Sequence, residues 1–142
     1  METQHIGLEI RTLSNLIHRK INQMVAEEEE TLTIHQIWVL DFLITSKGNR
    51  VAQRDIEKKF SVRRSTASHM LKLMENNGYI RRDSVSEDAR IKQIVLTEKG
   101  REAQERMKDR LLRFEAILQA GITEEELQNF FHMIERFQQN IE

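Results

Sequence analysis

The side chains best suited to chemistry lie on one face of a predicted helix over residues 63–77. Short hydroxyl groups, cations and an imidazole occur there, opposite an apolar face that includes Ala67, Leu71 and Met74. Cations neutralise phosphates or donate hydrogen bonds to guanine edges, and short hydroxyls approach bases closely. This face therefore predicts a nucleic-acid interface. Its candidate contact residues are Arg63, Arg64, Ser65, Thr66, Ser68, His69 and Lys72.

A second basic group belongs to a predicted β-hairpin. Residues 79–82 and 91–96 are short, β-branched and partly alternating, and turn-forming residues lie between them. An arginine at an exposed hairpin tip suits the narrow minor groove, so Arg90 is the strongest single candidate. Asp88 is expected to pair with an arginine and to hold the loop. The candidates in this hairpin are Arg81, Arg82, Asp88, Arg90 and Lys92.

Basic residues are concentrated around these two groups, although the chain of 142 residues has a formal charge of only −1. Residues 47–92 contain 12 Lys and Arg against 6 Asp and Glu, whereas the two flanks together contain 10 against 17. Attraction to phosphate is local, because salt screens charges beyond about 10 Å. The basic middle segment therefore fits a nucleic-acid partner better than the total charge indicates.

Both groups also have a simpler interpretation. Most charged side chains on a helix only solvate it, and Asp88 with Arg90 would then be an exposed ion pair worth less than about 1 kcal/mol. For His69, contact with a base or phosphate and a role in solvation are equally open. We favour DNA contact for Arg64 and Lys72, because a bare helical bundle has no use for an arginine-bearing hairpin directly after a basic helix.

Five further helices are predicted around these groups. Apolar periodicity marks helices over 4–28, 34–46 and 98–119, and a shorter one over 52–59. Thr33 and Gln36 form a capping box, Thr97 caps the helix at 98, and a capping box from Thr123 to Glu126 opens the last helix. The predicted fold is mainly α with a small β-hairpin, an α+β arrangement.

The chain resembles the MarR (multiple antibiotic resistance regulator) family. Asp88-Ala89-Arg90 followed by Leu96-Thr97-Glu98-Lys99-Gly100 matches the D-x-R…L-T-x-x-G signature of that family, and residues 51–80 resemble its helix-turn-helix. The resemblance implies a winged helix-turn-helix protein with the helix at 63–77 in the major groove. It implies one domain over 1–142, in which about 33–96 form the DNA-binding lobe and about 4–28 and 98–142 form dimerisation helices.

The function implied by the resemblance is that of a sequence-specific regulator of transcription that binds double-stranded DNA. A dimeric repressor on a pseudo-palindromic operator is expected, because a two-fold dimer presents two recognition helices to two half-sites. The sequence departs from the family pattern at three positions. Ala52 and Arg63 stand where a capping residue is common, and Glu57 stands where a small residue is common. Ser61 is then the best available cap for the helix at 63–77.

Apolar residues are over-supplied near the two chain ends. They exceed what a winged-helix core needs, which favours a two-fold interface over the alternative of an intrachain core. The predicted interface residues are Ile6, Ile10, Leu13, Phe130, Phe131, Ile134, Phe137 and Ile141.

A small, apolar or aromatic effector is a further expected partner, because proteins of this family commonly bind one between the dimerisation helices and the DNA-binding lobe. Side chains suited to such a cleft are Leu13, Ile17, Trp38, Phe42 and Met107. Apolar stripes at helical spacing are more often core, so we assign no ligand site from the sequence.

Other classes of protein fit less well. The chain has no cysteine, which excludes disulfides, thiol catalysis and cysteine-ligated zinc, and its five histidines are too scattered to predict a metal site or a cofactor. Neither an enzyme motif, a membrane span nor a secretory signal is recognisable, so a non-enzymatic, cytoplasmic protein is expected. A helical protein-interaction adaptor without DNA is the remaining alternative.

Overall fold

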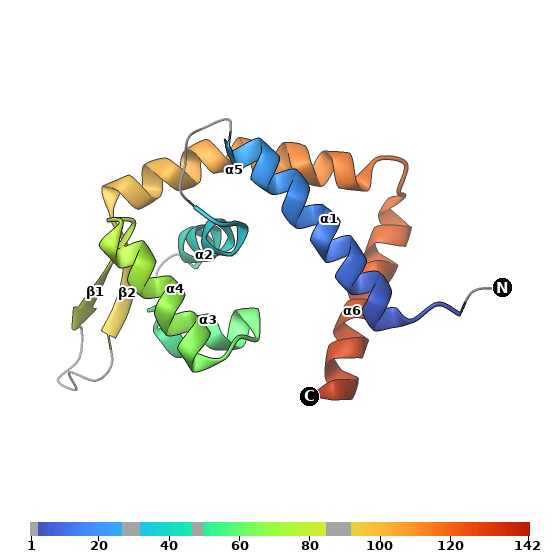
Figure 1. Ribbon diagram of the computed structural model, residues 1–142, viewed down its shortest axis with the longest axis horizontal. Coiled ribbons are helices and arrows are strands. Elements are labelled where there is room, and N and C mark those ends of the chain that lie inside the picture. The colour runs from blue at the N-terminus through green and yellow to red at the C-terminus, as the bar shows by residue number, and fades with distance from the viewer. Residues whose placement is uncertain (1–2, 27–31, 47–49, 85–91) are drawn as a thin grey trace. The chain divides into compact units, whose positions relative to one another are not determined.

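The computed structural model describes residues 3–26, 32–46, 50–84 and 92–142 (Figure 1). Each helix or strand boundary given by number above lies within two residues of the observed one, and the mainly helical fold with one antiparallel hairpin is confirmed. The elements are α1 (Ile6–Ala26), α2 (Ile34–Thr45), α3 (Gln53–Phe60), α4 (Arg64–Asn76), β1 (Ile80–Ser84), β2 (Lys92–Leu96), α5 (Glu98–Gln119) and α6 (Glu124–Ile141).

The chain divides into two compact units, residues 1–110 and 111–142, and α5 runs from the first into the second. The first unit contains α1 to α4, the hairpin and the first half of α5. The second contains the rest of α5 and α6. The helices in the described part of the chain are too short or too polar to cross a membrane.

The core of the first unit lies where α2, α3, α4 and the hairpin meet. α2 packs against α1 and β2, α3 packs against α4 and β2, and α4 packs against β1. Leu40 of α2, Ile56 of α3 and Leu71 of α4 have no exposed surface. Burying each such side chain stabilises the folded state by about 1.5–3 kcal/mol. These contacts hold the helix-turn-helix against the hairpin.

Local hydrogen bonds explain where two of the helices, α2 and α6, begin. Thr33 Oγ1 accepts from Gln36 N at 3.3 Å, and Gln36 Oε1 accepts from Thr33 N at 3.0 Å. The pair Thr123 and Glu126 repeats this arrangement at 3.1 and 3.0 Å. Each box satisfies two backbone N–H groups that a helix start leaves without a partner. Both predicted capping boxes are confirmed.

The turn between α3 and α4 corrects one prediction. Ser61 does not cap α4; it follows the last residue of α3 in the left-handed conformation, with φ of 50°. Val62 N then donates to the Glu57 carbonyl at 3.0 Å, the bond that closes a helix C-terminus with a left-handed residue. Arg63 is the N-cap of α4 and gives it no side-chain hydrogen bond. The prediction of Ser61 as a cap was wrong because Ser61 is needed to end α3 tightly.

The Leu96–Gly100 segment connects the hairpin to the end of α4. α4 ends at Asn76, and Gly78 in the turn that follows has φ of 82°. Thr97 Oγ1 donates to the Gly78 carbonyl at 2.5 Å and accepts from Gly100 N at 3.1 Å, so one hydroxyl caps α5 and holds the preceding turn. A Cβ on Gly100 would lie 2.1 Å from the Tyr79 carbonyl oxygen. The L-T-x-x-G pattern therefore has a packing reason at its Thr and Gly positions.

Candidate nucleic-acid interface

The recognition helix predicted from the sequence is α4, and its polar residues divide between two faces. Arg64, Ser68 and Lys72 follow one another every four residues and are all exposed, so they form one stripe along the helix. The buried side of the helix, at Ala67 and Leu71, holds the stripe away from the core. These three side chains, which we call the basic stripe, are free to contact a polyanion.

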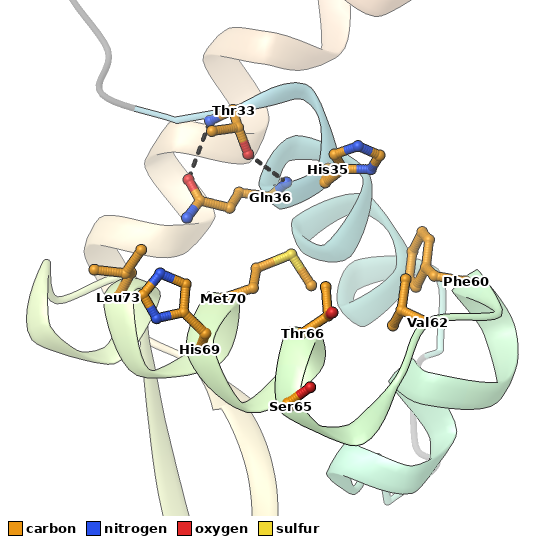
Figure 2. Close-up of a pocket in the computed structure, with 10 residues that line it drawn as sticks. All are labelled: Thr33, His35, Gln36, Phe60, Val62, Ser65, Thr66, His69, Met70 and Leu73. Atoms are coloured by element: carbon orange, nitrogen blue, oxygen red, sulfur yellow. Dashed lines mark hydrogen bonds between the residues drawn. The ribbon is translucent and has the colours of Figure 1, made fainter. Parts of the chain in front are cut away.

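The second face of α4 borders a pocket of about 490 Å³ (Figure 2). Thr66, His69 and Leu73 reach toward it from α4, and the start of α2 with the end of α3 closes it on the other side. The complete lining is Thr33, His35, Gln36, Phe60, Val62, Ser65, Thr66, His69, Met70 and Leu73. Three residues predicted to contact DNA therefore also line this pocket, namely Ser65, Thr66 and His69.

The start of α4 is suited to a phosphate. No described side chain caps this helix, so its first N–H groups point outward with the positive end of the helix dipole. Arg63 and Arg64 are both exposed at the same end. Two guanidinium groups beside uncapped backbone donors form a strongly anion-attracting end.

The hairpin directs its basic residues to two different sides. Arg81 pairs with Val95 on the outer face, where its Nε lies 3.1 Å from a carboxylate oxygen of Asp83. Arg82 is opposite the buried Ile94 and is half-buried, so it faces the helices. Of the other hairpin candidates, Lys92 is exposed at the start of β2. Asp88 and Arg90 lie outside the described residues.

The inward arginine is held by α3. Arg82 Nη1 donates to Gln53 Oε1 at 3.4 Å, and Gln53 Nε2 donates to the carbonyl of Arg64 at 3.4 Å. Near it, Ile94 N donates to the Val51 carbonyl at 2.7 Å, which ties β2 to the segment before α3. The hairpin is therefore attached to the helix-turn-helix by both backbone and side-chain bonds.

Two histidines meet between α1 and α2. His18 Nδ1 is bonded to the Ser14 carbonyl at 2.7 Å, and its Nε2 lies 3.4 Å from Nε2 of His35. Trp38 contacts both rings edge-on, with centroid distances of 6.5 and 5.7 Å. Burial, and secondly the charge of His18, lower the pKa of His35. The pair links α1 to α2 through this contact. Among the described residues, no three metal-ligating side chains gather in one place.

The predicted interface residues near the chain ends are mostly exposed. Phe130 and Phe131 are 49% and 52% exposed and contact each other, and Ile6 is 58% exposed. Ile10, Leu13 and Ile141 are exposed as well, whereas Ile134 and Phe137 are half-buried. Further exposed apolar residues that the sequence-based selection missed are Leu8, Leu16, Leu112, Ile117, Leu118, Ile122 and Met133. Several of these extend the same helices, so apolar exposure is a property of the ends as a whole.

Sequence reasoning also missed the pocket and the Gln53 contact. None of the residues proposed for an effector cleft lines this pocket; Met107 is instead fully buried, and Leu13 is 42% exposed. The pocket joins residues 33–36 to residues 60–73, and no periodicity within one helix reveals such a pairing. Gln53 resembles any surface glutamine until β1 is placed beside α3.

Comparisons with known proteins agree with this architecture. A profile of the MarR family matches residues 30–91. The uncharacterized HTH-type transcriptional regulator YwoH of Bacillus subtilis (strain 168) is 28% identical over 136 residues, covering 96% of each chain.

Two solved structures show that the chain shares their fold. One is the S. aureus MepR–DNA complex, with a TM-score of 0.85, 22% identity and 97% coverage of each chain. The other is the PcaV transcriptional regulator from Streptomyces coelicolor in complex with its natural ligand, with a TM-score of 0.85, 24% identity and complete coverage of both chains. A MarR-family profile thus matches the segment 30–91, and the whole chain shares the winged-helix fold of the solved MarR-type regulators.

Proposed function

We propose that this protein is a transcriptional regulator of the MarR family that binds double-stranded DNA in a sequence-specific manner, with α4 in the major groove and the hairpin along the neighbouring backbone. The observation that carries the proposal is the basic stripe of Arg64, Ser68 and Lys72, exposed on a helix whose opposite side is buried. The solved MepR–DNA complex, which has the same fold, supports it. Arg63, Ser65, Arg81 and Lys92 lie exposed beside the stripe or on the hairpin, as contacts to bases or phosphates require. Asp88 and Arg90 are proposed to complete the hairpin contact.

The regulator is proposed to act as a homodimer. None of the residues of α6 is buried, although phenylalanines and isoleucines recur along it, and the first half of α1 is exposed in the same way. Exposed apolar surface of this extent is typical of a face that another chain covers. A second copy is the natural partner, because a dimer places two α4 helices on two half-sites about one helical turn apart. A pseudo-palindromic operator and repression by occupancy follow.

The pocket beside α4 is proposed to receive the effector that releases DNA. Its lining is mostly apolar with hydroxyl and imidazole groups, which suits a small aromatic or apolar molecule with one polar substituent. PcaV, a relative in fold, was solved with its natural ligand. Since α4 provides five of the ten lining residues, an occupant would change the setting of the same helix that contacts DNA.

Titration of DNA from upstream of the regulator's own gene, at several salt concentrations, tests the DNA proposal. Lys72→Met is expected to weaken binding and to reduce the slope of log K against log salt by about 0.9, the contribution of one lost phosphate contact. Lys108→Met, which removes an exposed lysine from α5, is the matched control and should leave both quantities unchanged. Binding by the unmodified protein that depends on neither salt nor sequence would favour the adaptor alternative.

A further inference from the structure

Arg82 lies where a DNA-contacting arginine is least expected. In the register of the hairpin it pairs with Ile94, and Ile94 is 4% exposed, so this side of the strands faces the protein interior. Arg82 Nε is buried and has no hydrogen-bond partner in the described part of the chain. The neighbouring Arg81, by contrast, is exposed on the outer face. The two adjacent arginines therefore face different surroundings, and only one of them faces solvent.

The acceptor that holds the inward arginine comes from the first turn of α3. Gln53 Oε1 accepts from Arg82 Nη1 at 3.4 Å, and the same amide group donates through Nε2 to the Arg64 carbonyl at 3.4 Å. A carboxamide is the side chain that offers an acceptor and a donor at one end. Glutamate in its place would provide only acceptors, and methionine neither function. Gln53 thus connects the hairpin to the first residue of α4.

We propose that Gln53 is a positioning residue that sets the hairpin relative to α4, and that Arg82 acts through it rather than by contacting phosphate. The inference rests on the proposed DNA-binding function. A winged-helix protein must engage two grooves at once, so displacement of the hairpin from α4 costs contacts at both. Arg82 of the hairpin donates a hydrogen bond to Gln53, and the Arg64 carbonyl of α4 accepts a second one from it.

Salt dependence distinguishes positioning from phosphate contact. Loss of a phosphate contact lowers the slope of log K against log salt by about 0.9. Arg82→Met is instead expected to weaken DNA binding about fivefold with an unchanged slope, the scale of one hydrogen bond. Gln53→Met should have the same effect, and the double variant should bind no more weakly than either single variant. Lys72→Met, measured in parallel, gives the change in salt slope that loss of a phosphate contact produces.

Three further measurements separate this role from a general loss of stability and from failure of the proposed function. The urea midpoint of Gln53→Met should stay close to that of the unmodified protein, and Gln53→Glu should restore the bond to Arg82 without the bond to the Arg64 carbonyl, giving an intermediate affinity. In the NMR spectrum of the DNA-free protein, the side-chain amide signals of Gln53 should shift in Arg82→Met.

The outcomes are decisive in both directions. A reduced salt slope in Arg82→Met, or single-variant losses that multiply in the double variant, would overturn the proposal. Unshifted Gln53 amide signals in Arg82→Met would overturn it too, and this result does not depend on DNA. If the unmodified protein fails to bind DNA while those signals do shift, the contact stands and the proposed function is what fails.

Discussion

The proposed DNA-binding lobe and the two chain ends differ in how far their apolar residues are buried. In the lobe, Leu40, Ile56 and Leu71 have no exposed surface, and the hairpin and helices cover one another. In α6 nothing is buried, and Phe130 and Phe131 are about half exposed. One chain can complete the core of the lobe because its elements meet there from several directions. The apolar faces of the ends are exposed in the described part of the chain, which is why we propose that a second copy covers them.

The largest effect is expected from crowding the contact between the lobe, at Tyr79, and the first turn of α5. Gly100→Ala would place a Cβ 2.1 Å from the Tyr79 carbonyl oxygen, so the backbone must move. We expect a loss of at least about 3 kcal/mol in the free energy of unfolding, measured by urea denaturation. Gly7→Ala in α1 is the matched control: its Cβ meets nothing within 4 Å, and it should stabilise the protein by up to about 1 kcal/mol. Equal effects of the two changes would contradict the contrast between lobe and ends.

The second prediction concerns the ends. Phe131→Glu introduces a charge into the exposed apolar face of α6, which is 52% exposed at this residue. It should weaken self-association by about 2–4 kcal/mol, as loss of an aromatic anchor at an interface does. Sedimentation velocity over a range of concentrations measures this. Gln139→Glu adds the same charge at another exposed position of α6 and should leave the association unchanged; an equal loss there would mean that charge alone dissociates the protein.

A smaller effect on the free energy of unfolding is expected at Thr97, whose hydroxyl makes two hydrogen bonds between the turn after α4 and the start of α5. Thr97 Oγ1 donates to the Gly78 carbonyl and accepts from Gly100 N, and Thr97→Val removes both bonds at nearly constant volume. The free energy of unfolding should fall by about 1–2 kcal/mol. Thr97→Ser keeps the hydroxyl and should recover most of this loss in the same denaturation experiment. A serine variant as unstable as the valine variant would show that packing of the methyl group, rather than hydrogen bonding, is what matters.

The smallest effect concerns the contact between α1 and α2. The pKa of His35 is lowered in the folded protein by burial and by His18. As pH falls below the unfolded-state value of 6.5, the unfolded chain takes up this proton first, so the folded state loses stability toward acid. His35→Asn should reduce this loss, seen as a smaller decrease in urea midpoint between about pH 7.5 and 5.5. If the urea midpoint falls equally with pH in the variant and in the unmodified protein, His35 does not cause the loss of stability toward acid.

Much of the fold was predictable because the interactions that define its elements are local. The capping boxes at Thr33 and Thr123 join residues three apart, and the stripe of Ala67, Leu71 and Met74 follows from the period of a helix. The change to short β-branched segments after Gly78 likewise indicated the hairpin. Ser61 shows the limit, since whether a serine caps the next helix or ends the preceding one depends on the turn between them.

The sequence by itself determined the order of elements, the concentration of basic charge and the apolar excess at both ends, because each depends on residue type and on neighbours within a few positions. Only the tertiary structure decided how the polar residues of α4 divide between the basic stripe and the pocket. It also decided that Arg82 faces Gln53 while Arg81 faces solvent. Both outcomes depend on which surfaces α2 and α3 cover, and these are contacts between different elements of the chain.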